Sequence, residues 1–332
     1  MKNPVHILET ELPLPRVRIR ELDLEGGPLC ASFGSPGARL IESIREVGVL
    51  NPPLVAGRPE GGFAVVCGFK RLRALLSLGE ESCACRDLAP LALSPLELLR
   101  TALLENLAVR ELCPVEKAMA LARLVKVAGM DETLKSYMPT LGLPARRDTL
   151  NAYLALEGAE FETKDAISRG GLSFKAFQSA LDLSKDERGQ VLAFLAGLKY
   201  SFNNQLQVIE LLKDISEDNG MSIADVLDTP EIGSLLGDGS LNQPQKSSRI
   251  LDHLRTLRSP AISRAEKDFE RMVAACGLPK GVRIDHPPYF EGADLRMEIR
   301  FRSGPELVDT LSSLSGNRGV SALGMPWEVD EP

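Results

Sequence analysis

Three cations follow a glycine at a predicted strand-to-helix junction in this 332-residue chain. The segment VVCGFKRLRAL begins as an apolar strand, turns at Gly68, and continues as a helix that carries Lys70, Arg71 and Arg73. The free N–H groups of a helix N-terminus attract anions, and neighbouring cations strengthen that attraction. The segment therefore predicts a phosphate site. The alternative interpretation is a solvated basic helix face.

Two oxygen-bearing side chains stand together in the segment LLENLAVRELCPVEKA. Glu105 and Asn106 fall near the end of a predicted helix, and the next helix begins at Pro114. Carboxylate and amide oxygens suit a hard cation such as Mg²⁺, which proteins often hold together with substrate phosphates. The alternative interpretation is ordinary helix-end polarity before a loop.

Two short predicted helices, DETLKSYMPTLG and RDTLNAYLALEG, are separated by a turn with Gly142, which is the rhythm of a helix-turn-helix. The second helix would be the recognition helix, from which arginine can bind guanine and asparagine can bind adenine. Side chains on the first helix can bind backbone phosphates. Pro139 inside the first helix is irregular for such a motif. The candidate DNA-binding residues are Lys135, Ser136, Arg146, Arg147, Thr149 and Asn151.

The composition is that of an ordinary globular protein, with 44% hydrophobic and 26% charged residues. The formal net charge of −7 does not favour a nucleic-acid partner, although a local basic face can still bind phosphates. The N-terminus lacks the apolar stretch of a signal peptide, and no run approaches the roughly 18 apolar residues of a membrane span. We therefore expect a cytoplasmic protein without a membrane partner.

The six cysteines favour a structural role over metal or redox chemistry. Only Cys83 and Cys85 are close in sequence, and neither a second pair nor a nearby histidine completes a zinc-type set. Cys67 ends the apolar run VVC, so we expect its thiol to be buried rather than reactive.

The chain divides by pattern into parts of different character, which together predict an α+β multidomain protein. Strands and helices mix from about residue 12 to 90, helices follow from Ser94, and a helix–strand–strand–helix unit ends the chain. That last unit is too small to bury much surface alone, which favours dimerisation. The predicted parts are an α/β domain over 1–110, a helical domain over 111–215, a partly flexible linker over 216–248, rich in Gly, Asp, Asn, Ser and Pro, and a dimerisation domain over 249–332.

The order of these segments resembles that of the ParB family of chromosome and plasmid partition proteins. LPLPRVRI is similar to the family's opening segment, and SIREVGVLNPPLVAGRP to its Ser-Ile-x-x-x-Gly-x-x-x-Pro motif. CGFKRLRA is similar to the Gly-Glu-Arg-Arg-x-Arg-Ala box, and LLENLAVRELCPVEKA to the Glu-Asn-x-x-Arg-x-Asp-Leu-Asn-Pro-x-Glu motif. The helix-turn-helix and the C-terminal unit stand where the family has them. The joint order covers almost the whole chain.

This resemblance implies a fold and a function. The N-terminal domain would be a small α/β domain of the ParB/sulfiredoxin-like kind that binds CTP with Mg²⁺. The homodimer would load onto double-stranded DNA, close as a clamp, associate with the nucleoid, and stimulate a ParA-type ATPase. Segregation, transcription regulation and nucleoid occlusion all remain open as the biological role.

The resemblance also assigns the site residues, and it requires the cations after Gly68 to face the Glu105–Asn106 corner across one cleft. In this assignment Gly68, Arg71 and Arg73 contact the triphosphate, and Lys70 takes the place of the box's first arginine. Glu105 and Asn106 support the metal. The residues that shape the nucleoside side are Gly48 and Pro52.

Besides Lys70, three departures from the family motifs bear on the expected site. Phe69 replaces the glutamate of the box, Cys113 replaces an asparagine, and Val109 replaces an arginine. An arginine, Arg110, stands one position after the motif position. One residue on a helix is a rotation of about 100 degrees, so Arg110 does not obviously replace the lost side chain. Losing one charge-assisted phosphate contact costs about 1.5–3 kcal/mol. We therefore expect weakened CTP binding, and hydrolysis is an open question.

Two other function classes remain open. One is a degenerate ParB-like scaffold or transcriptional regulator without CTP turnover, which the acidic balance and the altered motifs favour. The other is an enzyme, either a ParB-like nuclease or a sulfiredoxin-like phosphotransfer enzyme. The enzyme would require a reactive cysteine or a compact carboxylate cluster beside the phosphate box.

Overall fold

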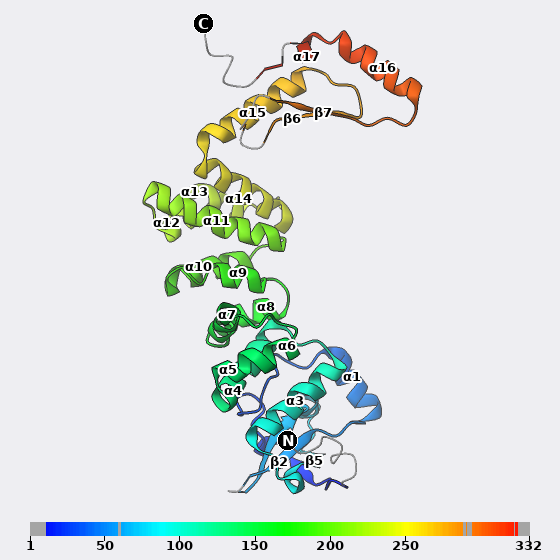
Figure 1. The fold of residues 1–332 in the computed structure, drawn as a ribbon, viewed down its shortest axis with the longest axis vertical. Helices are drawn as coiled ribbons and strands as arrows, with labels where there is room; N and C mark the ends of the chain where they lie inside the picture. The colour runs from blue at the N-terminus through cyan, green and yellow to red at the C-terminus, as the bar shows by residue number, and fades with distance from the viewer. Residues whose placement is uncertain (1–10, 59–60, 288–289, 291–293, 322, 325–332) are drawn as a thin grey trace. The chain divides into compact units, whose positions relative to one another are not determined.

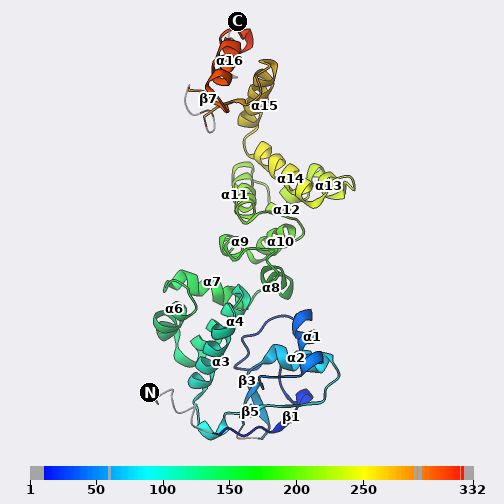
Figure 2. The ribbon, with the colours of Figure 1, turned by 90° about the vertical axis from the view of Figure 1, so that its right-hand side faces the viewer.

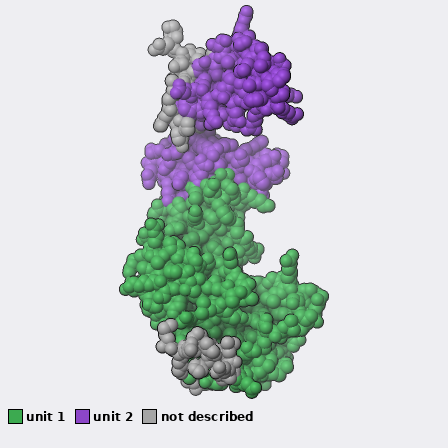
Figure 3. Space-filling view, turned by 45° about the vertical axis from the view of Figure 1, so that its right-hand side comes forward, with its two compact units in different colours: residues 1–206 green, residues 207–332 purple. Residues whose placement is uncertain are grey.

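The computed structural model describes residues 11–58, 61–287, 290, 294–321 and 323–324 (Figure 1). The chain forms two compact units, residues 1–206 and 207–332 (Figure 3). Its class is mixed α/β, and helices make up most of it. No helix among these residues is both long and apolar enough to cross a membrane.

The first part of unit 1 is a small α/β assembly. Strands β2 and β3 pair antiparallel, β5 adds to β2 in parallel, and β1 pairs with β4. The strands are β1 (Arg16–Arg18), β2 (Leu54–Gly57), β3 (Phe63–Cys67), β4 (Ser82–Ala84) and β5 (Arg86–Asp87). Helices α1 (Ala38–Val47) and α2 (Phe69–Ser77) pack against each other, and short 3-10 turns lie at Ile19–Glu21 and Ala89–Leu91. Figure 2 shows both helices on one side of these strands.

A shared hydrophobic core joins these strands and helices. Ile19, Val55 and Leu72 are completely buried in it, and Ile44 from α1 is 7% exposed. Cys30, Cys83 and Cys85 belong to this core, and Cys67 and, in unit 2, Cys276 are buried as well, which agrees with the structural role expected from the sequence.

Two helices connect this assembly to the rest of unit 1. Helix α3 (Pro95–Val109) is capped by Ser94, whose side chain accepts a hydrogen bond from the Glu97 amide, while the Glu97 carboxylate accepts one from the Ser94 amide. This is the capping box that the sequence predicts. Helix α4 (Pro114–Ala128) follows after a short extended segment.

The predicted helix pair is present, with a local irregularity in its first helix. That helix consists of α5 (Met130–Glu132), a π-helical turn labelled η4 (Thr133–Tyr137) and α6 (Met138–Thr140). Pro139 cannot donate a backbone hydrogen bond, and a widened turn directly before it accommodates this loss. Helix α7 (Arg147–Glu157) packs closely on α4, and both contribute fully buried leucines such as Leu121 and Leu150.

Further helices complete unit 1. They are α8 (Phe161–Ser168), α9 (Phe174–Ser179), α10 (Lys185–Ala196) and the start of α11 (Phe202–Asn219). The Tyr153 ring on α7 stacks on Phe174 with centroids 4.1 Å apart. The buried Gln205 amide accepts from the Ser173 amide at 2.9 Å and donates to the Gly171 carbonyl at 2.8 Å. These contacts tie α9 to α7 and α11.

The linker predicted for residues 216–248 is wrong, because this segment is helical. After the end of α11, helices α12 (Ile223–Leu227), α13 (Pro230–Gly237) and α14 (Gln243–Arg258) follow in close succession. Ile223, Val226 and Ile232 are buried. The polar residues that suggested flexibility instead cap helices: Ser222 forms a capping box with Asp225, and Asn242 forms one with Gln245.

The end of unit 2 has the predicted helix–strand–strand–helix order. Helix α15 (Pro260–Ala275) is followed by the antiparallel strands β6 (Val282–Asp285) and β7 (Arg296–Ile299), and then by α16 (Gly304–Ser315) and α17 (Arg318–Ser321). Phe269 and Ile284 belong to its small core. Large apolar side chains stay exposed here: Met297, Phe301, Val308 and Leu311.

We expect Leu150→Ala to lower the free energy of unfolding of unit 1 by about 2–5 kcal/mol, because it opens a cavity between α4 and α7. Urea denaturation followed by circular dichroism measures this change. Leu104→Ala is the control, since Leu104 is 45% exposed on α3 and its truncation should have a much smaller effect. Equal destabilisation by the two substitutions would contradict the packing described here.

Candidate functional site

A cavity of about 440 Å³ lies in unit 1 between α1, α2 and α3. Its walls also include the loop around Ala31, the loop from Gly48 to Asn51, and the end of β3. Apolar side chains such as Leu40 and Val66 alternate in its lining with charged ones. A cavity with this mixture can hold a ligand that is apolar at one end and charged at the other.

The cations after Gly68 and the Glu105–Asn106 pair, both singled out from the sequence, meet in this cavity. Lys70 and Arg71 at the start of α2 line it together with Glu105 and Asn106 near the end of α3. The Arg71 Nη2 lies 3.3 Å from the Glu105 Oε1, and the Arg71 Nη1 donates to the Asn51 carbonyl. The shared cleft that the sequence required is therefore present.

Gly68 sets the start of α2 at this cavity. Its φ of +96° is left-handed, which side chains other than glycine rarely adopt. A Cβ at this position would lie 2.9 Å from the Pro53 Cβ. Glycine thus allows β3 to turn directly into α2, so that the first amides and cations of the helix face the cavity.

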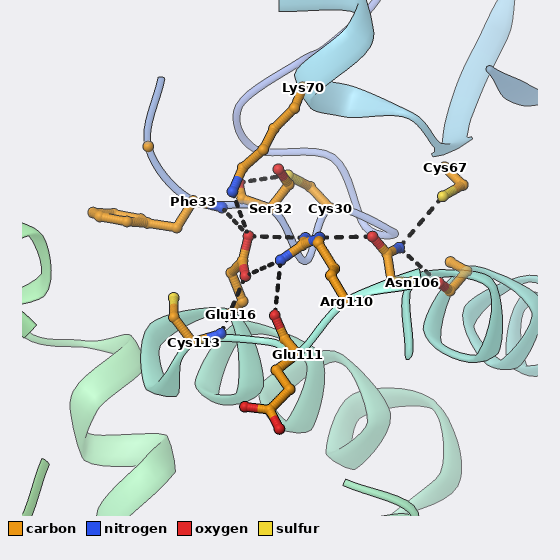
Figure 4. Close-up of polar contacts among 12 residues, drawn as sticks. Cys30, Ser32, Phe33, Cys67, Lys70, Asn106, Arg110, Glu111, Cys113 and Glu116 are labelled. Carbon is orange, nitrogen blue, oxygen red and sulfur yellow. Dashed lines mark hydrogen bonds and ion pairs between the residues drawn. The ribbon is translucent and has the colours of Figure 1, made fainter. Parts of the chain in front are cut away.

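A buried carboxylate behind the cavity holds two cations in place (Figure 4). Glu116 in the first turn of α4 is 1% exposed. The Lys70 Nζ lies 3.0 Å from its Oε1, and the Arg110 fork reaches both oxygens, with Nη1 2.5 Å from Oε2 and Nη2 3.0 Å from Oε1. The amides of Phe33 and Cys113 also donate to it at 3.4 and 3.3 Å. Glu116 therefore joins α2, the end of α3, α4 and the Phe33 loop.

The pKa of Glu116 is lowered from its ordinary value of 4.5. Burial alone would raise this pKa, but the hydrogen bond and charge of Arg110 and the charge of Lys70 outweigh the effect of burial. Glu116 is consequently ionised at neutral pH.

The Cys67 thiol lies at the Glu105–Asn106 corner. It donates to the Glu105 Oε2 at 2.6 Å and accepts from the Asn106 Nδ2 at 3.3 Å. Burial, together with the hydrogen bond to Glu105 and its negative charge, raises the pKa of Cys67 to about 12. The thiol is therefore protonated at neutral pH and supplies no nucleophilic thiolate.

Glu105 and Asn106 offer a limited set of metal ligands. The Asn106 Oδ1 accepts from the Arg110 Nη2 at 3.3 Å, and Glu105 accepts from both Arg71 and Cys67. In the described part of the chain, no three His, Cys, Asp or Glu side chains gather around a common metal position. Two oxygen donors fit a Mg²⁺ ion that takes most of its ligands from phosphates and water.

Two predicted site residues point elsewhere. The Arg73 guanidinium donates to the carbonyls of Leu24, Ser32 and Gly34, the last two at 3.2 and 3.1 Å. Arg73 therefore ties the loop of residues 24–34 to α2, and it is not among the residues that line the cavity. Pro52 lines a second cavity, of about 510 Å³, which Gly48 also borders. Gly48 lines the first cavity as expected.

The expectation for Arg110 also requires correction. Helix α3 ends at Val109, and Arg110 has an extended backbone with φ −160° and ψ 162°. The 100-degree rotation on a helix therefore does not apply to Arg110, whose side chain turns back toward Glu116 and lines the cavity. Sequence analysis considered Arg110 without assigning it to the site, and it missed Glu116, although the Pro-x-Glu spacing of Pro114 and Glu116 marks a carboxylate in the first turn of a helix.

The candidate DNA-binding residues lie on the surface of the helix pair. Lys135 and Ser136 are exposed on η4, and Arg146, Arg147 and Asn151 are exposed at and after the start of α7. Thr149 is half-buried. The guanidinium of Arg147 lies 3.1 Å from the Asp131 carboxylate, so this arginine already has an acidic partner across the pair. The exposed groups can donate to phosphates and bases, and nearby carboxylates reduce the local positive charge.

Residues 38–107 match the family model described as the ParB N-terminal domain. The chain is 33% identical over 172 residues to the chromosome-partitioning protein Spo0J of Thermus thermophilus, covering 51% of this chain and 57% of that protein. It is 29% identical over 153 residues to the nucleoid occlusion protein of Geobacillus thermodenitrificans, covering 46% and 51%. The chain thus spans little more than half the length of these relatives.

Two crystal structures of C-terminally truncated ParB from Caulobacter crescentus are also similar. One, complexed with CTP-γ-S, has 22% identity and a TM-score of 0.26, covering 55% of this chain and 98% of that one. The other, complexed with the centromeric parS site, has 17% identity and a TM-score of 0.33, covering 59% and 98%. TM-scores at this level do not establish a shared overall arrangement.

We expect Glu116→Gln to destabilise unit 1 by about 3–5 kcal/mol at pH 7, since it leaves Lys70 and Arg110 without their carboxylate. Because the folded-state pKa of Glu116 is lowered, its contribution is present above the unfolded value of about 4.5 and is lost as the pH falls through the folded value. Urea denaturation between pH 7 and pH 3 should therefore show the difference from wild type shrinking below pH ~4.5.

Glu111→Gln is the matched control for this substitution. Its side chain is exposed in the segment between α3 and α4, so we expect a change within about 0.5 kcal/mol at any pH. A Glu116→Gln deficit that stays constant down to pH 3 would mean that the carboxylate charge is not what stabilises this junction.

Proposed function

We propose that this chain is a DNA-binding adaptor of the partition type that binds a nucleoside triphosphate in its unit 1 cavity. The match of residues 38–107 to the ParB N-terminal domain supports this proposal. The supporting observation is the placement of Lys70 and Arg71 opposite Glu105 and Asn106 in one cavity. Cations and helix amides on one wall suit phosphates, and oxygen donors on the other suit a metal.

The nucleotide proposed is CTP, as the family resemblance implies. Apolar groups at Leu40 and Ile44, next to Gly48, would enclose the nucleoside, while Lys70 and Arg71 hold the phosphates. Mg²⁺ would sit between the phosphates and the Glu105–Asn106 corner, where it neutralises phosphate charge. Turnover would require a positioned water or base, and the protonated Cys67 thiol does not provide one.

Double-stranded DNA is the proposed partner of the helix pair. The start of α7 would enter the major groove, where Asn151 and Arg146 can contact base edges, and Lys135 on η4 would contact the phosphate backbone. The relatives are a chromosome-partitioning protein and a nucleoid occlusion protein, so the adaptor would act at the nucleoid in one of these roles.

Dimerisation through the end of unit 2 completes the proposal. Met297, Phe301, Val308 and Leu311 expose apolar surface around β7 and α16, and a unit this small gains stability by covering such surface with a second copy. A ParA-type ATPase is the further partner that the family resemblance implies, and closure of the dimer around DNA would be gated by CTP.

A scaffold without nucleotide turnover is the second candidate. The net charge of −7 and the Arg147–Asp131 pair both weaken attraction to DNA, which favours this alternative over the enzyme classes. A phosphotransfer enzyme of the sulfiredoxin-like kind is disfavoured because the pKa of Cys67 is raised to about 12.

We expect the wild type to bind CTP, and Arg71→Ala to weaken that binding by about 10- to 100-fold, because it removes a charge-assisted phosphate contact. Isothermal titration calorimetry with CTP and Mg²⁺ measures the affinity. Arg18→Ala is the control, since Arg18 pairs with Glu21 on the surface away from the cavity and should leave binding unchanged. Equal affinity in Arg71→Ala and wild type would rule out this cavity as the phosphate site.

We expect Asn151→Ala to weaken binding to a DNA fragment selected by the wild type from a random library by about 1–3 kcal/mol. Lys135→Ala should reduce affinity similarly for all sequences and lower the dependence on salt. Gel-shift titrations at several salt concentrations give both quantities, with Arg188→Ala on α10 as the control. Wild-type behaviour of both variants would favour the scaffold.

A further inference from the structure

The end of α3 brings Arg110 into the cavity, although the corresponding arginine of the family motif stands one position earlier. Val109 occupies the motif position and is 76% exposed. The Arg110 amide still donates to the Asn106 carbonyl at 3.0 Å, but its backbone is extended, so the side chain leaves the helix direction. Val109 and Arg110 both line the cavity, and only Arg110 brings a charged side chain to it.

The Arg110 guanidinium is held in a fixed orientation. Its two Nη atoms grip both oxygens of the buried Glu116, and they also donate to the Asn106 Oδ1 and to the Glu111 carbonyl at 3.3 and 3.4 Å. The Nε–H has no hydrogen-bond partner among the residues that the structure describes. The side chain is 33% exposed, so one donor of an oriented arginine remains open to a ligand.

Arg110 also decides the charge of the cavity. Lys70 and Arg71 are balanced by Glu116 and Glu105, their ion-pair partners. Arg110 adds a third cation to this described group, which gives the wall a net positive charge. The described group holds three cations, Lys70, Arg71 and Arg110, against two carboxylates, Glu105 and Glu116, and this surplus of one positive charge attracts a polyanion such as a triphosphate.

We propose that Arg110 contacts the phosphates of the bound nucleotide and replaces the arginine that the family motif has at position 109. This proposal rests on the proposed function, that the cavity binds CTP. Glu116 is too deeply buried to meet the ligand, and it acts as a positioning residue that orients Arg110 and Lys70.

The test compares CTP affinity by isothermal titration calorimetry in the wild type, Arg110→Ala, and the double variant Arg110→Ala/Glu116→Gln. The double variant removes the buried carboxylate that Arg110→Ala alone would leave with Lys70 as its remaining cation. We expect both variants to bind CTP about 10- to 100-fold more weakly, and the double variant to stay folded by circular dichroism. Arg100→Ala, an exposed arginine on α3, should bind within about twofold of wild type.

Three results would overturn the proposal, and they are distinguishable. Absence of CTP binding in the wild type would refute the proposed function and this inference together. Wild-type binding with Arg110→Ala within twofold of it would refute this inference alone. If Arg110→Ala binds CTP weakly and the double variant regains the wild-type affinity, Arg110 merely neutralises Glu116 and does not contact phosphate.

Discussion

The arrangement of unit 1 depends on a carboxylate that is removed from water. Glu116 is almost completely buried, and an ionised group in that position is tolerated only when cations and hydrogen-bond donors surround it. Lys70, Arg110 and two backbone amides meet this requirement. They come from α2, from the segment after α3, and from the loop that contains Phe33. The need to satisfy one charge thereby fixes how these three segments meet the first turn of α4.

The same constraint links the cavity to the helix pair. Helix α4 carries Glu116 in its first turn, and farther along it packs on α7, where the candidate DNA-contacting residues begin. A rigid helix that contacts both regions can transmit a displacement from one to the other. The contact through α4 is spatial. Energetic coupling between the two regions would be measured as the effect of a cavity ligand on the affinity for DNA, and of DNA on the affinity for that ligand.

Local chemistry made much of the fold predictable from the sequence. The strand–turn–helix at Gly68, the capping box at Ser94 and the helix pair around Gly142 each follow from residue types a few positions apart. The linker prediction failed because Ser, Asp and Asn favour helix caps as strongly as they favour loops, and at Ser222 and Asn242 they cap helices.

The site was predictable in part. Lys70, Arg71, Glu105 and Asn106 meet because β3, α2 and α3 are adjacent in the fold that the resemblance implies. The backbone acceptors of Arg73 were not predictable, because they lie about 40–50 positions earlier in the chain, beyond the reach of local patterns. Arg110 was not assigned to the site because its direction depends on the residue at which α3 ends, and helix ends are poorly determined by sequence patterns.

The ion pair between Arg71 and Glu105 links the binding of a phosphate to the binding of a divalent cation. A phosphate that engages Arg71 competes with Glu105 for the same guanidinium. Once displaced, the Glu105 carboxylate loses its counter-charge and becomes a better ligand for a divalent cation beside the phosphates. Nucleotide and metal would thus each raise the affinity of the cavity for the other by the same factor, as thermodynamic reciprocity requires.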